Sequence, residues 1–160
     1  MADVSANISR AMKKSTYPTA QDAEAAFYEA LERADLEAMM EVWADDEEVA
    51  CIHPGGPRLA GFEQVRQSWA LMFKSGQRLR VQLSDQIVAA GMMFAIHSLH
   101  ENILAEGGGQ VARSVVVTTN VYMRSGGGWR MVLHHGSPAV AARGGGSGSG
   151  PTPEPPKVVH

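Results

Sequence analysis

His53 is the residue of this sequence best placed to do chemistry. It closes a short apolar run that begins at Val49, and a Pro-Gly-Gly-Pro segment starting at Pro54 follows it directly. Alternation along a strand puts Val49, Cys51 and His53 on one face. A neutral imidazole, with an unperturbed pKa of about 6.5, can act as base, as acid or as a hydrogen-bond partner for a ligand. The alternative is a histidine that caps the turn before Pro54.

The adjacent pair His134 and His135 is a second candidate site. Successive strand residues point to opposite faces, so a regular strand can turn only one of the two rings toward an interior. The apolar residues Trp129, Met131 and Leu133 share a face with His135 in such a strand. Both histidines therefore remain candidates for ligand contact, with packing or an interface hydrogen bond as the alternative for either.

The remaining histidines and the cysteine give no pattern for a metal or a nucleophile. His97 and His100 are three residues apart, an odd separation that puts them on opposite faces of a regular strand. The chain has six histidines without recognised ligand spacing, so we expect no metal and no cofactor. The single Cys51 cannot form an intrachain disulfide, lacks a signature of activation, and is expected to be buried and inert.

Polar and aromatic residues extend the candidate binding site. Asn120 and Glu101 lie in strand-like runs, where a polar side chain is costly to bury without a partner. An inward Asn120 would indicate a ligand contact; the alternative is an outward, solvated pair. Trp43 and Trp69 are predicted to belong to the core or to a cavity wall, and a ligand of such a wall should be apolar. The methionines assigned to the same layer are Met39, Met40, Met72, Met92 and Met93.

Three helices are predicted to precede the sheet. Thr19 and Asp22 have the spacing of a capping box, and the first helix runs to about Arg33. Asp35 can cap a second helix that ends by Asp45, and a third helix starts near residue 62 and is capped near residue 76. The apolar face of the first helix is predicted from Ala23, Phe27, Ala30 and Ala34, and the core-facing stripe of the second from Leu36, Met39, Met40 and Trp43.

From Leu79 onward the hydrophobic period changes to two, which predicts strands. An alternating run from Leu79 is followed by strand-like runs over residues 92–104 and 111–123. Glycine clusters at residues 107–109 and 125–128 predict hairpins that join the last three strands into an antiparallel meander. The predicted fold class is α+β, with three N-terminal helices packed on one face of a curved, mostly antiparallel sheet.

Composition limits the domain organisation and the partners. The chain has 160 residues, a formal net charge of −3 and 44% hydrophobic residues, which is typical of one globular domain and argues against nucleic-acid binding. No apolar run is long enough to span a bilayer, so we expect no membrane partner and a cytoplasmic location. We expect a flexible arm over residues 1–16, the domain over residues 17–142, and a disordered Gly/Ser/Pro-rich tail over residues 143–160.

Several local stretches form a recognisable set: Trp43-Ala-Asp-Asp, Cys51-Ile-His-Pro-Gly followed by Gly61, Trp129-Arg-Met-Val-Leu-His-His, and the pairs Glu101-Asn102 and Thr119-Asn120. Over roughly residues 20 to 140 the sequence in these stretches resembles the SnoaL-like branch of the nuclear transport factor 2 superfamily. The resemblance implies a cone-shaped fold with a cavity between sheet and helices. In that fold the face of Val49, Cys51 and His53 looks into the cavity, and a rough alignment puts His134 inside.

The resemblance does not extend to the chemistry of ketosteroid isomerase. That relative needs a carboxylate base, a tyrosine and a carboxylic acid, and around these positions the chain has Cys51 or His53, Phe27, and Asn120 or Val121. Phenylalanine cannot donate a hydrogen bond, and losing one oxyanion donor costs a factor of roughly 10² to 10³ in rate. Isomerisation by the same residues is therefore not expected.

These observations favour a homodimeric domain that binds an apolar small molecule. An alternative is a cofactor-free isomerase, cyclase or hydratase that uses His53 as acid or base. A further alternative is an oligomerising module resembling the association domain of calmodulin-dependent kinase, which needs no cavity chemistry. A polar cavity open to solvent would favour the binder or the enzyme, and a filled core would favour the association module.

Overall fold

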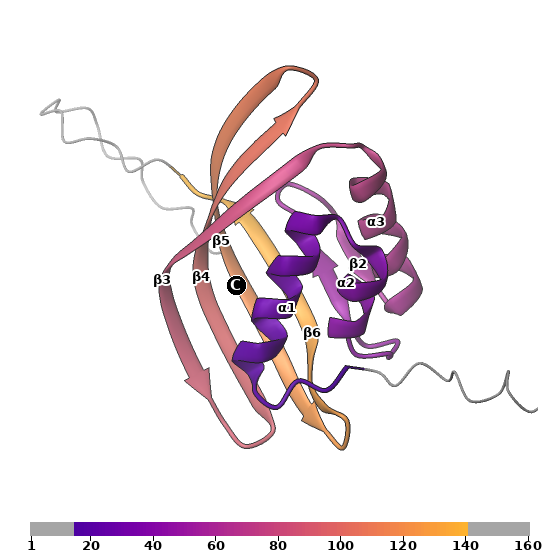
Figure 1. Cartoon of the computed structure of the whole chain (residues 1–160). Coiled ribbons are helices and arrows are strands. Elements are labelled where there is room, and N and C mark those ends of the chain that lie inside the picture. Colours follow the sequence, from indigo (N-terminus) through magenta and orange to yellow (C-terminus); the bar gives the residue numbers. More distant parts are fainter. Residues whose placement is uncertain (1–14, 141–160) are drawn as a thin grey trace, which may run out of the picture.

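The computed structural model describes residues 15–140, in which three helices cover one face of a six-stranded sheet (Figure 1). The predicted tail and residues 1–14 of the predicted arm lie outside the described residues. The helices are α1 Ala20–Arg33, α2 Leu36–Val42 and α3 Phe62–Lys74. The strands are β1 Ala50–Ile52, β2 Arg58–Ala60, β3 Arg78–Ala90, β4 Phe94–Gly107, β5 Gln110–Ser125 and β6 Gly128–Pro138.

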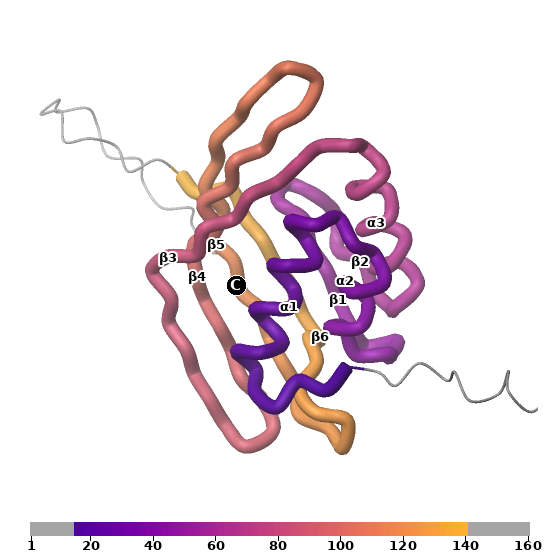
Figure 2. Tube along the Cα trace, in the orientation of Figure 1, coloured from indigo at the N-terminus to yellow at the C-terminus, as the bar shows by residue number. Residues whose placement is uncertain are grey.

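The strand order is β2-β1-β6-β5-β4-β3, so the short β1–β2 hairpin extends the sheet at the β6 edge. β1 runs parallel to β6, and the other neighbouring pairs are antiparallel. The predicted meander is confirmed and includes β3 as well. The β4–β5 hairpin extends beyond the helical layer, as the chain trace shows (Figure 2). The sheet is therefore covered by helices over only part of one face.

The start of α1 confirms the predicted capping box. The Thr19 hydroxyl accepts the backbone N–H of Asp22 at 3.0 Å, and the Asp22 carboxylate accepts the backbone N–H of Thr19 at 3.0 Å. The helix ends at Arg33, as the spacing predicts. Ala34 was wrongly placed on the apolar face, because it is the exposed C-cap with a left-handed backbone, φ 52°.

The second helix is shorter than the sequence predicts. It ends at Val42 because Trp43 adopts an extended backbone and bridges to Met131 of β6. The backbone N–H of Ala44 donates to the carbonyl of Met131 at 2.9 Å, which ties this end of the helix to the sheet. Met39, Met40 and Trp43 are buried as predicted.

The methionine prediction is wrong for Met92 and Met93. Their side chains are 85% and 55% exposed in the turn between β3 and β4. Sequence hydrophobicity extends the strand-like run back to Met92, but β4 begins at Phe94. This turn reaches past the end of α1 (Figure 1), so no helix covers it.

Candidate functional site

A β-bulge in β6 decides which of the paired histidines faces the helices. Val121 pairs with Leu133 and Tyr122 pairs with Met131, which leaves Val132 as an extra residue. An extra residue shifts the alternation by one, so side chains three positions apart come to the same face. Met131 and His134 are both buried in consequence.

His135 lies on the opposite face of the sheet from His134 and is exposed. The structure therefore brings one histidine of the pair to the interior. His97 and His100 also lie on opposite faces, as their spacing predicts: His97 is buried, and His100 contacts the Asp85 carboxylate at 3.0 Å on the outer face.

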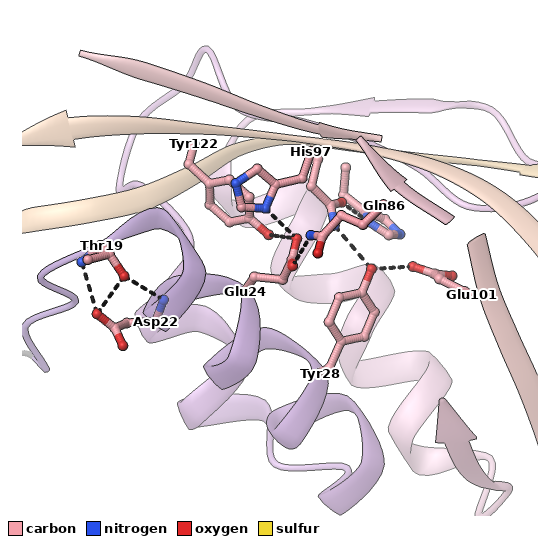
Figure 3. A network of polar contacts seen from close by, with 10 residues as sticks. Thr19, Asp22, Glu24, Tyr28, Gln86, His97, Glu101 and Tyr122 are labelled. Atoms are coloured by element: carbon pink, nitrogen blue, oxygen red, sulfur yellow. Dashed lines mark hydrogen bonds and ion pairs between the residues drawn. The ribbon is translucent and has the colours of Figure 1, made fainter. Parts of the chain in front are cut away.

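His134 ends a chain of hydrogen bonds that crosses the interior from β6 to β4. Figure 3 labels Tyr28 and Glu101 at its other end. Nδ1 of His134 lies 2.7 Å from Oδ1 of Asn120. The Asn120 amide donates to the Tyr28 hydroxyl at 3.0 Å, and that hydroxyl donates to Oε1 of Glu101 at 2.6 Å. Asn120 and Glu101 are thus inward and paired, which rules out the outward, solvated alternative.

The direction of these donors fixes the state of the His134 ring. Because the Asn120 amide nitrogen donates to Tyr28, the Asn120 oxygen is the acceptor and Nδ1 of His134 carries the proton. The other ring nitrogen, Nε2, is then an acceptor. Burial first, and the positive charges that His53 and His135 can carry second, lower the pKa of His134 to about 3. The ring is neutral at pH 7.

Glu101 lies at the other end of these linked hydrogen bonds. Burial raises the pKa of its carboxyl group, while the hydrogen bond from Tyr28 lowers it. The pKa of Tyr28 is raised far above its ordinary value, by burial first and by the nearby Glu101 carboxylate second. Tyr28 therefore remains a hydroxyl donor and holds Asn120 in one orientation.

A second buried cluster surrounds Glu24, one turn before Tyr28 on α1 (Figure 3). Its carboxylate accepts from Gln86 at 2.6 Å and from the Tyr122 hydroxyl at 3.3 Å, and lies 2.7 Å from Nδ1 of His97. Gln86 reaches inward because β3 is bulged between Ser84 and Ile87. Nε2 of His97 is buried and makes no hydrogen bond within the described part of the chain.

His53 is half-buried at the end of β1. Its Nε2 lies 3.1 Å from the Ser68 hydroxyl, which itself donates to the carbonyl of Val65 at 2.8 Å. The Ser68 oxygen is therefore the acceptor, Nε2 of His53 carries the proton, and Nδ1 is an acceptor. Burial lowers the pKa of His53, so this ring is also neutral at pH 7.

Cys51 lies beside the same imidazole, with Sγ 3.7 Å from Nε2 of His53. Burial raises the pKa of the Cys51 thiol to about 12, and the Glu101 carboxylate adds to the effect. The prediction of a buried cysteine is confirmed. A thiol with this pKa is not a nucleophile at pH 7.

Trp69 forms the wall between the two neutral histidines. Its ring centroid is 4.7 Å from that of His53 and 6.0 Å from that of His134. The Phe27 ring lies beside both, 5.0 Å from His134 and 5.6 Å from Trp69. The indole nitrogens of Trp43 and Trp69 are buried and unpaired among residues 15–140. Aromatic rings fill this region, and two open pockets elsewhere on the domain, of about 770 and 340 Å³, do not reach it.

The sequence interpretation missed Glu24 and Tyr28, the residues of α1 that organise both clusters. The signal was present: the two lie four residues apart, on the face that also carries Ala20, Ala23 and Phe27. A polar pair on an otherwise apolar helix face indicates buried partners. Gln86, His97 and Tyr122 could not be assigned to them, because they lie 62 to 98 residues away along the chain.

Groups of three or more potential metal-ligating side chains are absent among residues 15–140. In the same part of the chain, no helix is long and apolar enough to cross a membrane.

The model of the SnoaL-like domain family matches residues 21–141, and the chain belongs to this family, within the NTF2-like superfamily. A Thiobacillus denitrificans structure named as a calcium/calmodulin-dependent protein kinase type II association domain is 40% identical, with a TM-score of 0.69 over 79% of this chain and 99% of that one. A Streptomyces avermitilis protein named as a dehydratase of the NTF2-like family is 35% identical, with a TM-score of 0.70 over 74% of this chain and 93% of that one.

A plant protein also matches. The F-box protein SKIP8 of Arabidopsis thaliana is 28% identical over 118 residues, which is 69% of this chain. The match spans 46% of the plant protein, so the chain corresponds to less than half of that relative.

Proposed function

We propose that this domain binds a small apolar molecule that carries a hydrogen-bond donor, in the region walled by Trp69. Nε2 of His134 and Nδ1 of His53 are the acceptors that the tautomers leave for it. Phe27 and Trp69 supply apolar contact to the rest of the molecule. Neither open pocket reaches this region, and a filled core taken alone favours the association module. Binding therefore requires the rings to move apart, and the expected ligand is no larger than one aromatic ring.

The observation that carries this proposal is the buried chain from His134 to Glu101. Burying a carboxyl group, an amide and an imidazole costs free energy even when they are paired, and apolar residues would fill the same space at less cost. A core that served packing alone would not need this arrangement. The linked hydrogen bonds hold the His134 ring in one tautomer and one orientation. A binding site needs this and a packed core does not.

Two alternatives have specific support. The Streptomyces avermitilis relative is named as a dehydratase, and a half-buried, neutral His53 could serve as a base in such a reaction. The Thiobacillus denitrificans relative is named as an association domain, and the uncovered face of the sheet carries apolar side chains suited to assembly. An assembly role is compatible with an interior ligand.

Phenol and toluene separate these readings, because they have similar size and only phenol has a donor. We expect phenol to shift the ¹⁵N resonance of His134 Nε2 or His53 Nδ1, and to bind at least about fivefold more tightly than toluene, since a hydrogen bond to a buried acceptor contributes about 1 to 3 kcal/mol. Isothermal titration gives the affinities.

His53→Ala removes the acceptor Nδ1 of His53. Tyr28→Phe removes a hydrogen bond of the series that orients the other acceptor, Nε2 of His134. Each should weaken phenol binding while leaving the weaker toluene binding unchanged. Equal affinity for phenol and toluene, or no response of either histidine, would contradict the proposal and favour the association module. If a substrate is found, His53→Ala abolishing turnover without changing substrate affinity would support the enzyme instead.

A further inference from the structure

The larger open pocket, of about 770 Å³, lies far from the histidines, on the part of the sheet where β3, β4 and β5 run side by side. Its lining includes Arg80, Leu104, Arg113 and Val115, and Val140 at the end of the described chain. We name it the β3–β5 trough. Its volume lies within the range of small-molecule sites, about 300 to 1,000 Å³.

The sheet register puts two arginines on one face of the trough. Arg80 of β3 pairs with Leu104 of β4, and Leu104 pairs with Arg113 of β5. Directly paired residues point to the same face, so the two arginines flank Leu104. Neighbouring strands are about 4.8 Å apart, which separates the arginine backbones by about 10 Å. Side chains of this length can converge on one anion above Leu104.

Glu106 lies on the same face as these arginines, two residues beyond Leu104 on β4, where it pairs across the sheet with Arg78. Neither arginine of the trough takes part in an ion pair with another residue between 15 and 140. The one carboxylate that lines the trough, Glu32, accepts the backbone N–H of Val81 at 2.7 Å. The trough therefore presents two guanidinium groups against a carboxylate that is already engaged.

On its β5 side the trough continues with apolar side chains, whereas Gln82 and Asn102 line it on β3 and β4. Val115 lies two residues after Arg113 on β5 and so on the same face. The backbone N–H of Ala139 donates to the carbonyl of Val115 at 2.9 Å, which brings the segment before Val140 alongside β5. Val115 and Val140 are 41% and 92% exposed, so both can gain apolar contact. Two cations at one end and apolar side chains beyond them match an anion with an apolar body.

We propose that the β3–β5 trough binds a carboxylate with an aliphatic chain, with Arg80 and Arg113 on the carboxylate and Val115 and Val140 on the chain. Guanidinium groups match the planar geometry of a carboxylate and can bind it through paired hydrogen bonds. This site is separate from the region around Trp69, and the inference does not rest on the function proposed for that region.

The test uses octanoate, with 1-octanol as the uncharged control of the same chain length. The protein is titrated with each probe while the methyl resonances of Leu104 and Val115 are followed by NMR. We expect octanoate to shift these methyls and to bind about tenfold more tightly than octanol, with an advantage that shrinks as salt is raised. Arg80→Gln and Arg113→Gln should each weaken octanoate binding about tenfold and leave octanol unchanged.

Arg124→Gln is the matched control, because Arg124 is an exposed arginine on β5 that does not line the trough. It should bind octanoate as the unaltered chain does. Equal binding of both probes, equal weakening by Arg124→Gln, or shifts at His134 in place of Leu104 would each overturn the proposal. So would a second copy covering these methyls and leaving them unresponsive to octanoate.

Discussion

His134 is neutral because its ring is buried and hydrogen-bonded to Asn120, and this makes the stability of the domain depend on pH. Burial lowers the pKa of His134 to about 3 in the folded chain, against an ordinary value of 6.5. Between these two values the unfolded state binds more protons than the folded state. The free energy of unfolding should therefore rise with pH across this window, by up to about 1.4 kcal/mol per pH unit for one proton.

His134→Gln tests this prediction, because glutamine keeps an amide donor for Asn120 but does not titrate. Urea unfolding at several pH values from 4 to 7 should give a smaller rise for the variant. Glu101 acts in the opposite sense: its pKa is raised, so its contribution decreases as pH rises above the ordinary 4.5. Glu101 and His53 are present in both the unaltered protein and the variant. The difference between their stability–pH curves therefore reports on His134. Parallel curves for the two chains would contradict the assignment.

Ala34 is the position at which helix α1 carries avoidable backbone strain. Its backbone is left-handed, with φ 52°, and its N–H bonds back to the carbonyls of Ala30 and Leu31. A left-handed residue with a Cβ costs about 1 to 2 kcal/mol, and glycine avoids that cost while losing more backbone entropy on folding. Ala34→Gly should raise the free energy of unfolding by about 0.5 to 1 kcal/mol in urea titrations.

Ala25→Gly is the control for the same chemical change within the helix. Ala25 is exposed in the middle of α1, where glycine should lower the free energy of unfolding by about 1 kcal/mol. The two substitutions should therefore have opposite signs. Destabilisation by both would show that Ala34 does not adopt the left-handed backbone in solution.

The face of the sheet away from the helices is where we predict that two copies of the whole molecule associate. Neighbouring strands expose apolar side chains on it, away from the β3–β5 trough: Phe94 and Ile96 on β4 are 52% and 45% exposed, and they pair with Met123 and Val121 of β5. A contiguous apolar surface of this kind is unusual on a monomer and favours an interface. We expect two copies to pack through this end of the face and to leave the trough open.

Light scattering at micromolar concentration should give twice the chain mass of 17.1 kDa. Ile96→Lys should shift the mass toward the monomer, because the dimer would bury an unpaired charge. Leu71→Lys is the control: Leu71 is 73% exposed on α3, on the helical side of the sheet, and should leave the mass unchanged. A monomer mass for the unaltered chain would contradict the dimer.

The sequence alone determined the features that depend on neighbours along the chain. Helical spacing after Thr19 predicted α1 and its capping box, and alternation predicted that His97 and His100 lie on opposite faces. The inward direction of Cys51 followed from alternation together with the family resemblance. The helix and the alternation follow from the periods of helix and strand, 3.6 and two residues, which are local properties of the backbone. The same periods gave the order of elements and the α+β class.

Only the tertiary structure decided which polar groups meet. The bulge at Val132 turned His134 inward, although regular alternation could not choose between it and His135. Tyr28 meets Glu101 and Asn120 across 73 and 92 residues of chain. A bulge is set by how two strands pair, and a buried hydrogen bond by how a helix packs on a sheet; no local period encodes either of them.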